Sequence, residues 1–218
     1  MTIKACLFDL DGVIVDTAKY HFAAWRRMAN KLGFDFTHEE NEKLKGVSRM
    51  DSLALILKWG GVEKTHEEQL QLSTQKNDWY VESIANMQAD EVLEGIPEFL
   101  AELKGKGIRI GLGSASRNAP RILEAVGLMS YFETLIDGSK TTKGKPDPQV
   151  FQMGAEELGV KPSETIVFED APKGVDAALA GGFYAVGIGE EANLGHAHYV
   201  MPGFVGLSLE MLEKQLTV

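Results

Sequence analysis

Carboxylates, hydroxyls and one amine stand at the ends of apolar runs that are far apart in this 218-residue sequence. Four carboxylates within a few ångströms of one another cannot all stay ionised without a cation. Oxygen ligands with no cysteine or paired histidine nearby favour a hard divalent ion, and Mg²⁺ fits best because it leaves positions for water and phosphate oxygens. An amine and a hydroxyl beside that ion suit an anionic group, so the pattern predicts phosphoryl transfer. The residues are Asp9, Asp11, Ser114, Ser116, Lys145, Glu169 and Asp170.

Each of these motifs, taken alone, has an ordinary structural interpretation. Asp11-Gly12 is a turn signal, and the acidic pair before Ala171-Pro172 is typical of the start of a helix. The serines and the lysine could equally be loop residues. Their occurrence together, at the ends of successive predicted strands, favours the functional interpretation.

The elements that must position these groups alternate between strand and helix. The run Ile3–Leu10 predicts a buried strand, and after Asp90 strands are separated by helices, which is typical of a parallel sheet. We therefore expect an α/β fold with a doubly wound parallel sheet, whose ligands bind beyond the carboxyl ends of the strands. The further expected strands are 108–113, 134–136, 165–168, 184–188 and a candidate at 198–200, and the expected helices are 118–126, 149–158, 175–180 and 208–215.

A helical block of about 70 residues interrupts this pattern after the first strand. Thr37 and Thr65 are each followed three residues later by glutamate, which is the capping-box pattern, and Ser48 precedes another apolar helical repeat. No segment of the block has a strand pattern. We therefore expect a catalytic core made of residues 1–15 and 92–218, with an all-helical cap at 16–91 inserted into it.

Composition excludes several classes of protein. The 22 basic and 32 acidic residues give a formal charge of −10, which is unsuited to nucleic acid or to an anionic membrane surface. No apolar stretch is long enough to span a membrane, and Asp9 and Asp11 interrupt the region where a secretion signal would be apolar. Cys6 is the only cysteine, so we expect no internal disulfide and a cytoplasmic location, with Cys6 as a core residue.

Asp9-Leu10-Asp11-Gly12-Val13 resembles the signature of the haloacid dehalogenase (HAD) superfamily, and Ser114, Lys145-Pro146 and Glu169-Asp170 follow in the order of its other motifs. The resemblance implies a Rossmann-like core with a helical cap and an aspartyl-phosphate mechanism. Asp9 would be the nucleophile and Asp11 the general acid and base. Mg²⁺ would be held by Asp9, Glu169, Asp170 and the backbone carbonyl of Asp11, while Ser114 and Lys145 would bind the transferring phosphoryl group.

Within that superfamily, the sequence closely resembles the β-phosphoglucomutases, in cap residues and in one core segment. The residues that carry this resemblance are Asp16–His21 with Trp25, Lys45–Arg49, Lys76–Asp78 and Ser114–Asn118. It implies that Arg49 binds the phosphate that is not transferred and that His21 and Lys76 assist near Asp11. Position 117 is Arg where Lys is more usual. The other implied substrate contacts are Thr17, Trp25, Gly46, Val47, Ser116, Arg117 and Asn118, although burial in the cap is the alternative for Trp25.

The implied reaction is an isomerisation with phosphoryl transfer. It interconverts β-D-glucose 1-phosphate and D-glucose 6-phosphate through an aspartyl-phosphate enzyme and β-glucose 1,6-bisphosphate. We expect a monomer in carbohydrate metabolism whose partners are a sugar phosphate and the bisphosphate activator. The alternatives are a phosphatase of the same fold and a phosphate-sensing protein without activity. The intact Asp9, Asp11 and Lys145 disfavour the sensing protein, since it needs no nucleophile.

Overall fold

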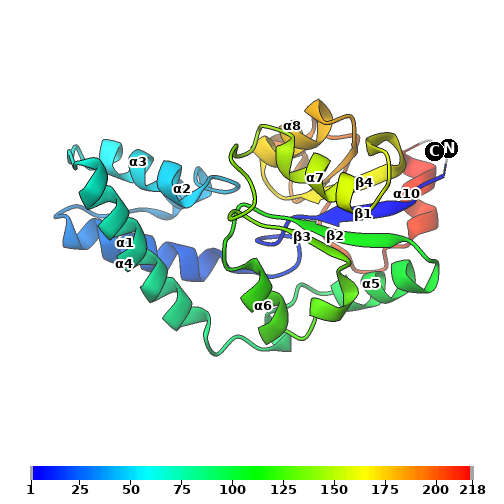
Figure 1. Ribbon diagram of the computed structural model, residues 1–218, viewed down its shortest axis with the longest axis horizontal. Coiled ribbons are helices and arrows are strands. Elements are labelled where there is room, and N and C mark those ends of the chain that lie inside the picture. Colours follow the sequence, from blue (N-terminus) through cyan, green and yellow to red (C-terminus); the bar gives the residue numbers. More distant parts are fainter. Residues whose placement is uncertain (1, 217–218) are drawn as a thin grey trace.

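The core of the protein is a six-stranded sheet in which all neighbouring strands are parallel, in the order β3-β2-β1-β4-β5-β6. The computed structural model describes residues 2–216. β1 lies at the centre of the sheet, between β2 and β4, so the strand that carries Asp9 and Asp11 at its end is buried on both sides (Figure 1). The strands are β1 (Ala5–Phe8), β2 (Arg109–Gly113), β3 (Thr134–Ile136), β4 (Thr165–Glu169), β5 (Tyr184–Ile188) and β6 (Tyr199–Met201).

Helices cover both faces of the sheet. Successive side chains of β1 point to opposite faces, and both sets are apolar, so each face needs a covering layer. Cys6 and Phe8 pack into a cluster with α5, α6 and α10, whereas Ala5 and Leu7 pack into a second cluster with α7 and α8. This arrangement confirms the doubly wound α/β fold. The helices are α5 (Ile96–Gly105), α6 (Ala119–Ala125), α7 (Gln149–Glu157), α8 (Pro172–Ala180), α9 (Glu191–Leu194) and α10 (Leu209–Gln215).

The segment between β1 and α5 contains the helices α1 (Ala18–Lys31), α2 (His38–Glu42), α3 (Arg49–Trp59) and α4 (His66–Ile84), which lie together beside the sheet (Figure 1). They have a hydrophobic cluster of their own, which includes Trp25 and Met28. Both predicted capping boxes are present, at Thr37 and Thr65. Ser48 caps α3 by accepting a hydrogen bond from the backbone of Asp51. We call α1–α4 the cap.

Two backbone segments that pair with each other connect the cap to the core. Val15 and Val92 form an antiparallel bridge, and the nitrogen of Leu93 donates to the carbonyl of Ile14 at 2.9 Å. Glu91 also accepts hydrogen bonds from Tyr20 and Lys19, both at 2.6 Å. These contacts lie at the predicted boundaries 15/16 and 91/92, which remain a prediction.

The structure differs from the sequence-based expectations in a few elements. Helix α5 and the short α9 were not expected, and α8 begins at Pro172 rather than near Val175, with Pro at its first position. Cys6 is fully buried as expected, and burial raises the pKa of its thiol. Among residues 2–216 no helix is long and apolar enough to cross a membrane.

Candidate active site

The carboxyl ends of β1 and β4 bring three acids together. Oxygen atoms of Asp9, Glu169 and Asp170 lie within 4.8 Å of one another. The backbone holds this arrangement, because Phe8 pairs with Phe168 across the two strands and the nitrogen of Asp9 donates to the carbonyl of Phe168 at 3.0 Å. Asp9 and Glu169 are almost completely buried.

Lys145 lies inside this cluster of acids. Its Nζ donates to Asp9 Oδ1 at 2.6 Å, to the carbonyl of Gly113 at 3.0 Å and to Glu169. Burial alone would favour the neutral amine, but Asp9 and Glu169 raise the pKa of Lys145 above its ordinary value. The amine therefore stays protonated and supplies one positive charge among three carboxylates.

One ammonium does not balance this cluster. Burial, together with repulsion from Asp9 and Asp170, raises the pKa of Glu169 to about 8. Burial, together with repulsion from Asp9 and Asp11, raises the pKa of Asp170 to about 7. Two carboxylates that resist ionisation, close to the buried Asp9 and with oxygen as the only donor, fit a hard divalent cation. The donor set therefore suits Mg²⁺ or a similar ion.

Two glycines make room for these carboxylates. A Cβ atom on Gly174, in the first turns of α8, would overlap the carboxylate of Glu169. A Cβ on Gly12, whose φ is 79°, would overlap the carboxylate of Asp170. Gly12 belongs to the signature motif at the end of the first strand, but neither its contact with Asp170 nor that of Gly174 with Glu169 leaves a pattern in the sequence.

Asp11 is not one of the three clustered acids, and its carboxylate contacts the start of the first helix of the cap. Its carboxylate accepts a hydrogen bond from Thr17, and Nε2 of His21 lies 3.9 Å from Asp11 Oδ1. Burial and the charge of Asp9 raise the pKa of Asp11 to about 6. A carboxyl group with this pKa holds and releases a proton near neutral pH, as a general acid and base must.

His21 connects Asp11 to a buried lysine. Nζ of Lys76, in α4, lies 2.9 Å from Nδ1 of His21 and packs over the rings of Trp25 and Tyr80, 4.6 Å from each centroid. Burial, followed by the charge of Arg49, lowers the pKa of Lys76 to about 7. Burial and Lys76 lower the pKa of His21 well below its ordinary value, so the imidazole is neutral.

The loop after β2 presents polar groups on the same side. Ser114 is buried and accepts a hydrogen bond from the nitrogen of Ser116, and Ser116 accepts one from the nitrogen of Asn118. Nδ2 of Asn118 donates to Oδ1 of Asn77, in α4, at 3.0 Å. This loop therefore touches the cap directly.

Arg49, from the cap, and Arg117, from the core, approach each other closely enough that Arg117 lowers the pKa of Arg49, after the larger effect of burial. Nε of Arg117 donates to the carbonyl of Gly138 at 3.2 Å. Within residues 2–216 neither arginine forms an ion pair with a carboxylate of this chain. Two such guanidinium groups suit an anion such as phosphate.

Not every predicted contact residue faces the space between cap and core. Trp25 is only 2% exposed and belongs to the hydrophobic cluster of the cap, so its position agrees with the packing alternative. Thr17 is fully buried against Asp11. Gly46 and Val47 lie in the loop before α3, partly exposed, where Gly46 approaches Ala171 of the core.

Tyr80 is a residue of this region that the sequence analysis missed. Its ring centroid lies 4.2 Å from that of His21, and its hydroxyl is buried with no hydrogen-bond partner among the described residues. Burial and the charge of Asp11 raise its pKa well above the ordinary value. Nothing in the local sequence distinguishes this tyrosine from a core residue of α4.

The pattern of one protein family matches most of the sequence. The haloacid dehalogenase-like hydrolases match residues 3–182. The chain belongs to this family. The six-stranded parallel sheet with helices on both faces is therefore the HAD core expected from the four motifs.

Relatives within the HAD family include both mutases and phosphatases. A β-phosphoglucomutase of Bacillus subtilis (strain 168) is 40% identical over 98% of this chain and 95% of that protein. The crystal structure of a β-phosphoglucomutase from Clostridium difficile is similar, with a TM-score of 0.96 and 39% identity over 99% of this chain and 98% of that one. A phosphorylated carbohydrates phosphatase of Thermotoga maritima is 29% identical over 89% of each chain.

Proposed function

We propose that this protein is a β-phosphoglucomutase, which interconverts β-D-glucose 1-phosphate and D-glucose 6-phosphate. The observation that carries the proposal is that the protein has two regions that suit phosphate, one in the core and one formed jointly by cap and core. Lys145 and the acid cluster form one region, and Arg49 with Arg117 forms the other. A sugar that carries a phosphate at each end matches this arrangement, and two β-phosphoglucomutases resemble the whole chain.

In the proposed reaction, Asp9 attacks the phosphorus of the sugar bisphosphate. A bond forms between an Asp9 oxygen and phosphorus, and the bond from phosphorus to the sugar oxygen breaks. Asp11 gives its proton to that oxygen and later takes the proton of the attacking sugar hydroxyl, for which its pKa of about 6 is suited. Lys145 and Ser114 would hold the transferring phosphoryl group.

Asp9, Glu169 and Asp170, with the backbone carbonyl of Asp11, are the groups that we propose to hold Mg²⁺. The relatives are enzymes of a family whose members are generally metal-dependent, and the acid cluster suits a hard ion. Bound there, the ion would reduce the repulsion between the Asp9 carboxylate and the phosphate. The protein's own part is to orient Asp9 and to keep Lys145 charged beside it.

The remaining residues would bind and enclose the sugar phosphate. Arg49 and Arg117, with Ser116 and Asn118, would bind the phosphate that is not transferred, and the loop with Gly46 and Val47 would line the sugar. The neutral imidazole of His21, held by Lys76, would orient the Asp11 carboxyl group. Thr17 and Trp25 would act through these neighbours, because both are buried.

We further propose that residues 16–91 act as a cap that closes over the substrate. Closure excludes water, so that the phosphoryl group of Asp9 reaches a sugar hydroxyl rather than being hydrolysed. β-Glucose 1,6-bisphosphate would serve as the activator that first phosphorylates Asp9. A monomer in the cytoplasm completes the proposal, and the free, buried Cys6 supports the cytoplasmic location.

One assay separates the mutase from a phosphatase, which the Thermotoga relative makes the second candidate. The enzyme is given β-glucose 1-phosphate, Mg²⁺ and a trace of β-glucose 1,6-bisphosphate, and both glucose 6-phosphate and free phosphate are measured. We expect glucose 6-phosphate to exceed free phosphate by at least about 100-fold, given the water exclusion described above. Free phosphate as the main product would instead establish the phosphatase.

A further inference from the structure

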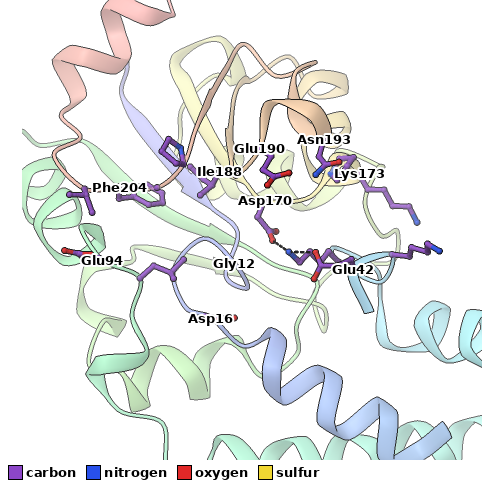
Figure 2. Close-up of a pocket in the computed structure, with 18 of the residues that line it drawn as sticks. Gly12, Asp16, Glu42, Glu94, Asp170, Lys173, Ile188, Glu190, Asn193 and Phe204 are labelled. Carbon is purple, nitrogen blue, oxygen red and sulfur yellow. Dashed lines mark ion pairs between the residues drawn. The ribbon is translucent and has the colours of Figure 1, made fainter. Parts of the chain in front are cut away.

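A cleft of about 950 Å³ opens on the Asp170 side of the junction between cap and core. Its lining comes from both parts: Glu42 and Lys45 belong to the cap side, and Asp170 and Glu190 belong to the core side (Figure 2). The cleft contains none of the groups that we assign to the sugar or to its second phosphate. Of the three clustered acids, only Asp170 lines this cleft.

Lys45 connects the two walls of this cleft. Its Nζ lies 3.5 Å from Oδ2 of Asp170 and 2.8 Å from Oε2 of Glu42, and Figure 2 draws these ion pairs as dashed lines between the two labelled acids. The side chain of Lys45 is 36% exposed and that of Asp170 only 9%. Among residues 2–216, Lys45 is the side chain that forms an ion pair with Asp170.

The two partners of Lys45 differ in environment. Asp170 is buried in the acid cluster, whereas the side chain of Glu42 is 60% exposed at the end of α2. The adjacent Gly46 has a φ of 69°, and a Cβ built there would lie 3.4 Å from that of Ala171. The loop that carries Lys45 is therefore in direct reach of the segment that carries Asp170.

We propose that Lys45 is a positioning residue whose ammonium group competes with the divalent cation for Asp170 and thereby couples cation binding to the position of the cap. The inference rests on the proposed cation site. An ammonium at Asp170 and a divalent cation held by the same carboxylate repel each other. Cation binding therefore displaces Lys45 toward Glu42, its other partner, and releases one contact between cap and core.

The coupling is reciprocal, as linkage requires. A cation bound at the acid cluster weakens the hold of Lys45 on Asp170, and a cap held by Lys45 weakens cation binding to the same extent. When no cation is bound, the ammonium group of Lys45 balances the charge of Asp170. Once the cation has bound, the loop around Gly46 is released from this contact. The proposed sugar contacts of that loop would then form on the cation-loaded protein.

The experiment measures Mn²⁺ binding to the full chain by calorimetry, after the protein has been stripped with a chelator and without any substrate. We expect Lys45→Met to bind Mn²⁺ about threefold to tenfold more tightly than the unmodified protein. Lys43→Met is the matched control, because Lys43 lines the same cleft but pairs with Glu39. Its dissociation constant should stay within about twofold of the unmodified value.

A double-mutant cycle tests the second partner. Glu42→Gln should weaken Mn²⁺ binding while Lys45 is present, because the displaced ammonium group loses its alternative partner. In the Lys45→Met background, Glu42→Gln should have no effect on Mn²⁺ binding. Glu39→Gln is its control. Hydrogen exchange on the unmodified chain gives a readout that needs no variant: Mn²⁺ should speed exchange in the loop at 44–47.

The outcomes are distinguishable. Unchanged or weaker Mn²⁺ binding by Lys45→Met, when the unmodified protein binds Mn²⁺ and Asp170→Asn does not, overturns the role of Lys45 and leaves the proposed cation site intact. Absence of Mn²⁺ binding by the unmodified protein overturns both. Equal tightening by Lys43→Met overturns the specific competition and assigns the effect to the general charge of the cleft.

Discussion

The acid cluster of the core has an excess of negative charge, whereas the basic region under the cap, formed by Arg49 and Arg117, has an excess of positive charge. In the core, Asp9, Glu169 and Asp170 surround the single ammonium of Lys145. Under the cap, Arg49 faces Arg117, and within residues 2–216 no carboxylate of this chain forms an ion pair with either guanidinium. The first region therefore requires a cation and the second an anion.

This difference explains how a chain with a formal charge of −10 could bind the doubly anionic sugar that we propose as its substrate. The overall field opposes the substrate, so binding depends on a few placed cations in a partly buried space. Both regions have their pKa values displaced mainly by burial: those of Glu169 and Asp170 upward, and those of Lys76 and Arg49 downward. In the proposed reaction, the phosphate groups and a divalent ion would supply the missing charges.

The largest expected effect comes from removing the nucleophile. Asp9→Asn keeps the shape of the side chain but removes the attacking charge, so mutase turnover should fall by at least about 10⁴-fold. Turnover is measured as glucose 6-phosphate formation, with circular dichroism as the control for folding. Retained turnover would contradict the assignment of Asp9 and, with it, the role of the acid cluster.

The basic region is tested by Arg49→Ala. We expect mutase turnover to fall about 100-fold, because the second phosphate loses a charged hydrogen-bond donor, while hydrolysis of a small phosphate ester changes little. Lys58→Ala is the matched control, since it removes a cation from the exposed far end of the same helix. Equal losses for both substrates would show that Arg49 supports the core rather than the second phosphate.

The close packing of the acid cluster is tested by Gly174→Ala. A methyl group at this position overlaps the carboxylate of Glu169, so we expect the free energy of unfolding to fall by about 1–3 kcal/mol and Mn²⁺ binding to weaken. Gly105→Ala, at the end of α5, has nothing within 4 Å of the new Cβ and should be neutral or slightly stabilising. Urea unfolding measures both. Equal stability of the two variants would mean that Glu169 moves without cost.

Much of the fold could be predicted because its signals are local. The apolar runs predicted the strands, and the pairs Thr37–Glu40 and Thr65–Glu68 predicted two helix starts that the structure confirms. Helix α5 was missed although Gly95 and Pro97 mark its start. The short α9 offers too few residues for a helical period to be recognised.

The strand ends predicted which residues form the candidate site, but not that Asp11 would be separate from the other three acids. The sequence placed Asp9 and Asp11 two residues apart and predicted one cluster of four carboxylates. In the structure the Asp11 carboxylate contacts Thr17 and His21 instead, both of which belong to the start of the cap. The contacts of Lys45, Gly174 and Tyr80 depend on tertiary packing between distant segments, which spacing in the sequence does not encode.

The smallest expected effect concerns the stability of the cap and its dependence on pH. The pKa of Lys76 in the folded protein is about 7, below its ordinary value of 10.5. Between these values the unfolded chain holds a proton that the folded chain has lost, so the contribution of Lys76 to stability rises with pH. It is complete above pH 10.5 and is lost as the pH falls through 7.

Lys76→Met removes this dependence. At pH 7 we expect the variant to be more stable than the unmodified protein by about 1–3 kcal/mol, because a buried ammonium is replaced by an apolar side chain, and the difference should shrink as the pH rises toward 10. Urea unfolding at several pH values measures it, with Lys31→Met, on the exposed end of α1, as the control. A difference that grows with pH would mean that Lys76 is charged in the folded cap and already paired. Mutase turnover should fall in the same stabilised variant, because His21 and Asp11 lose the side chain that we propose to help orient them.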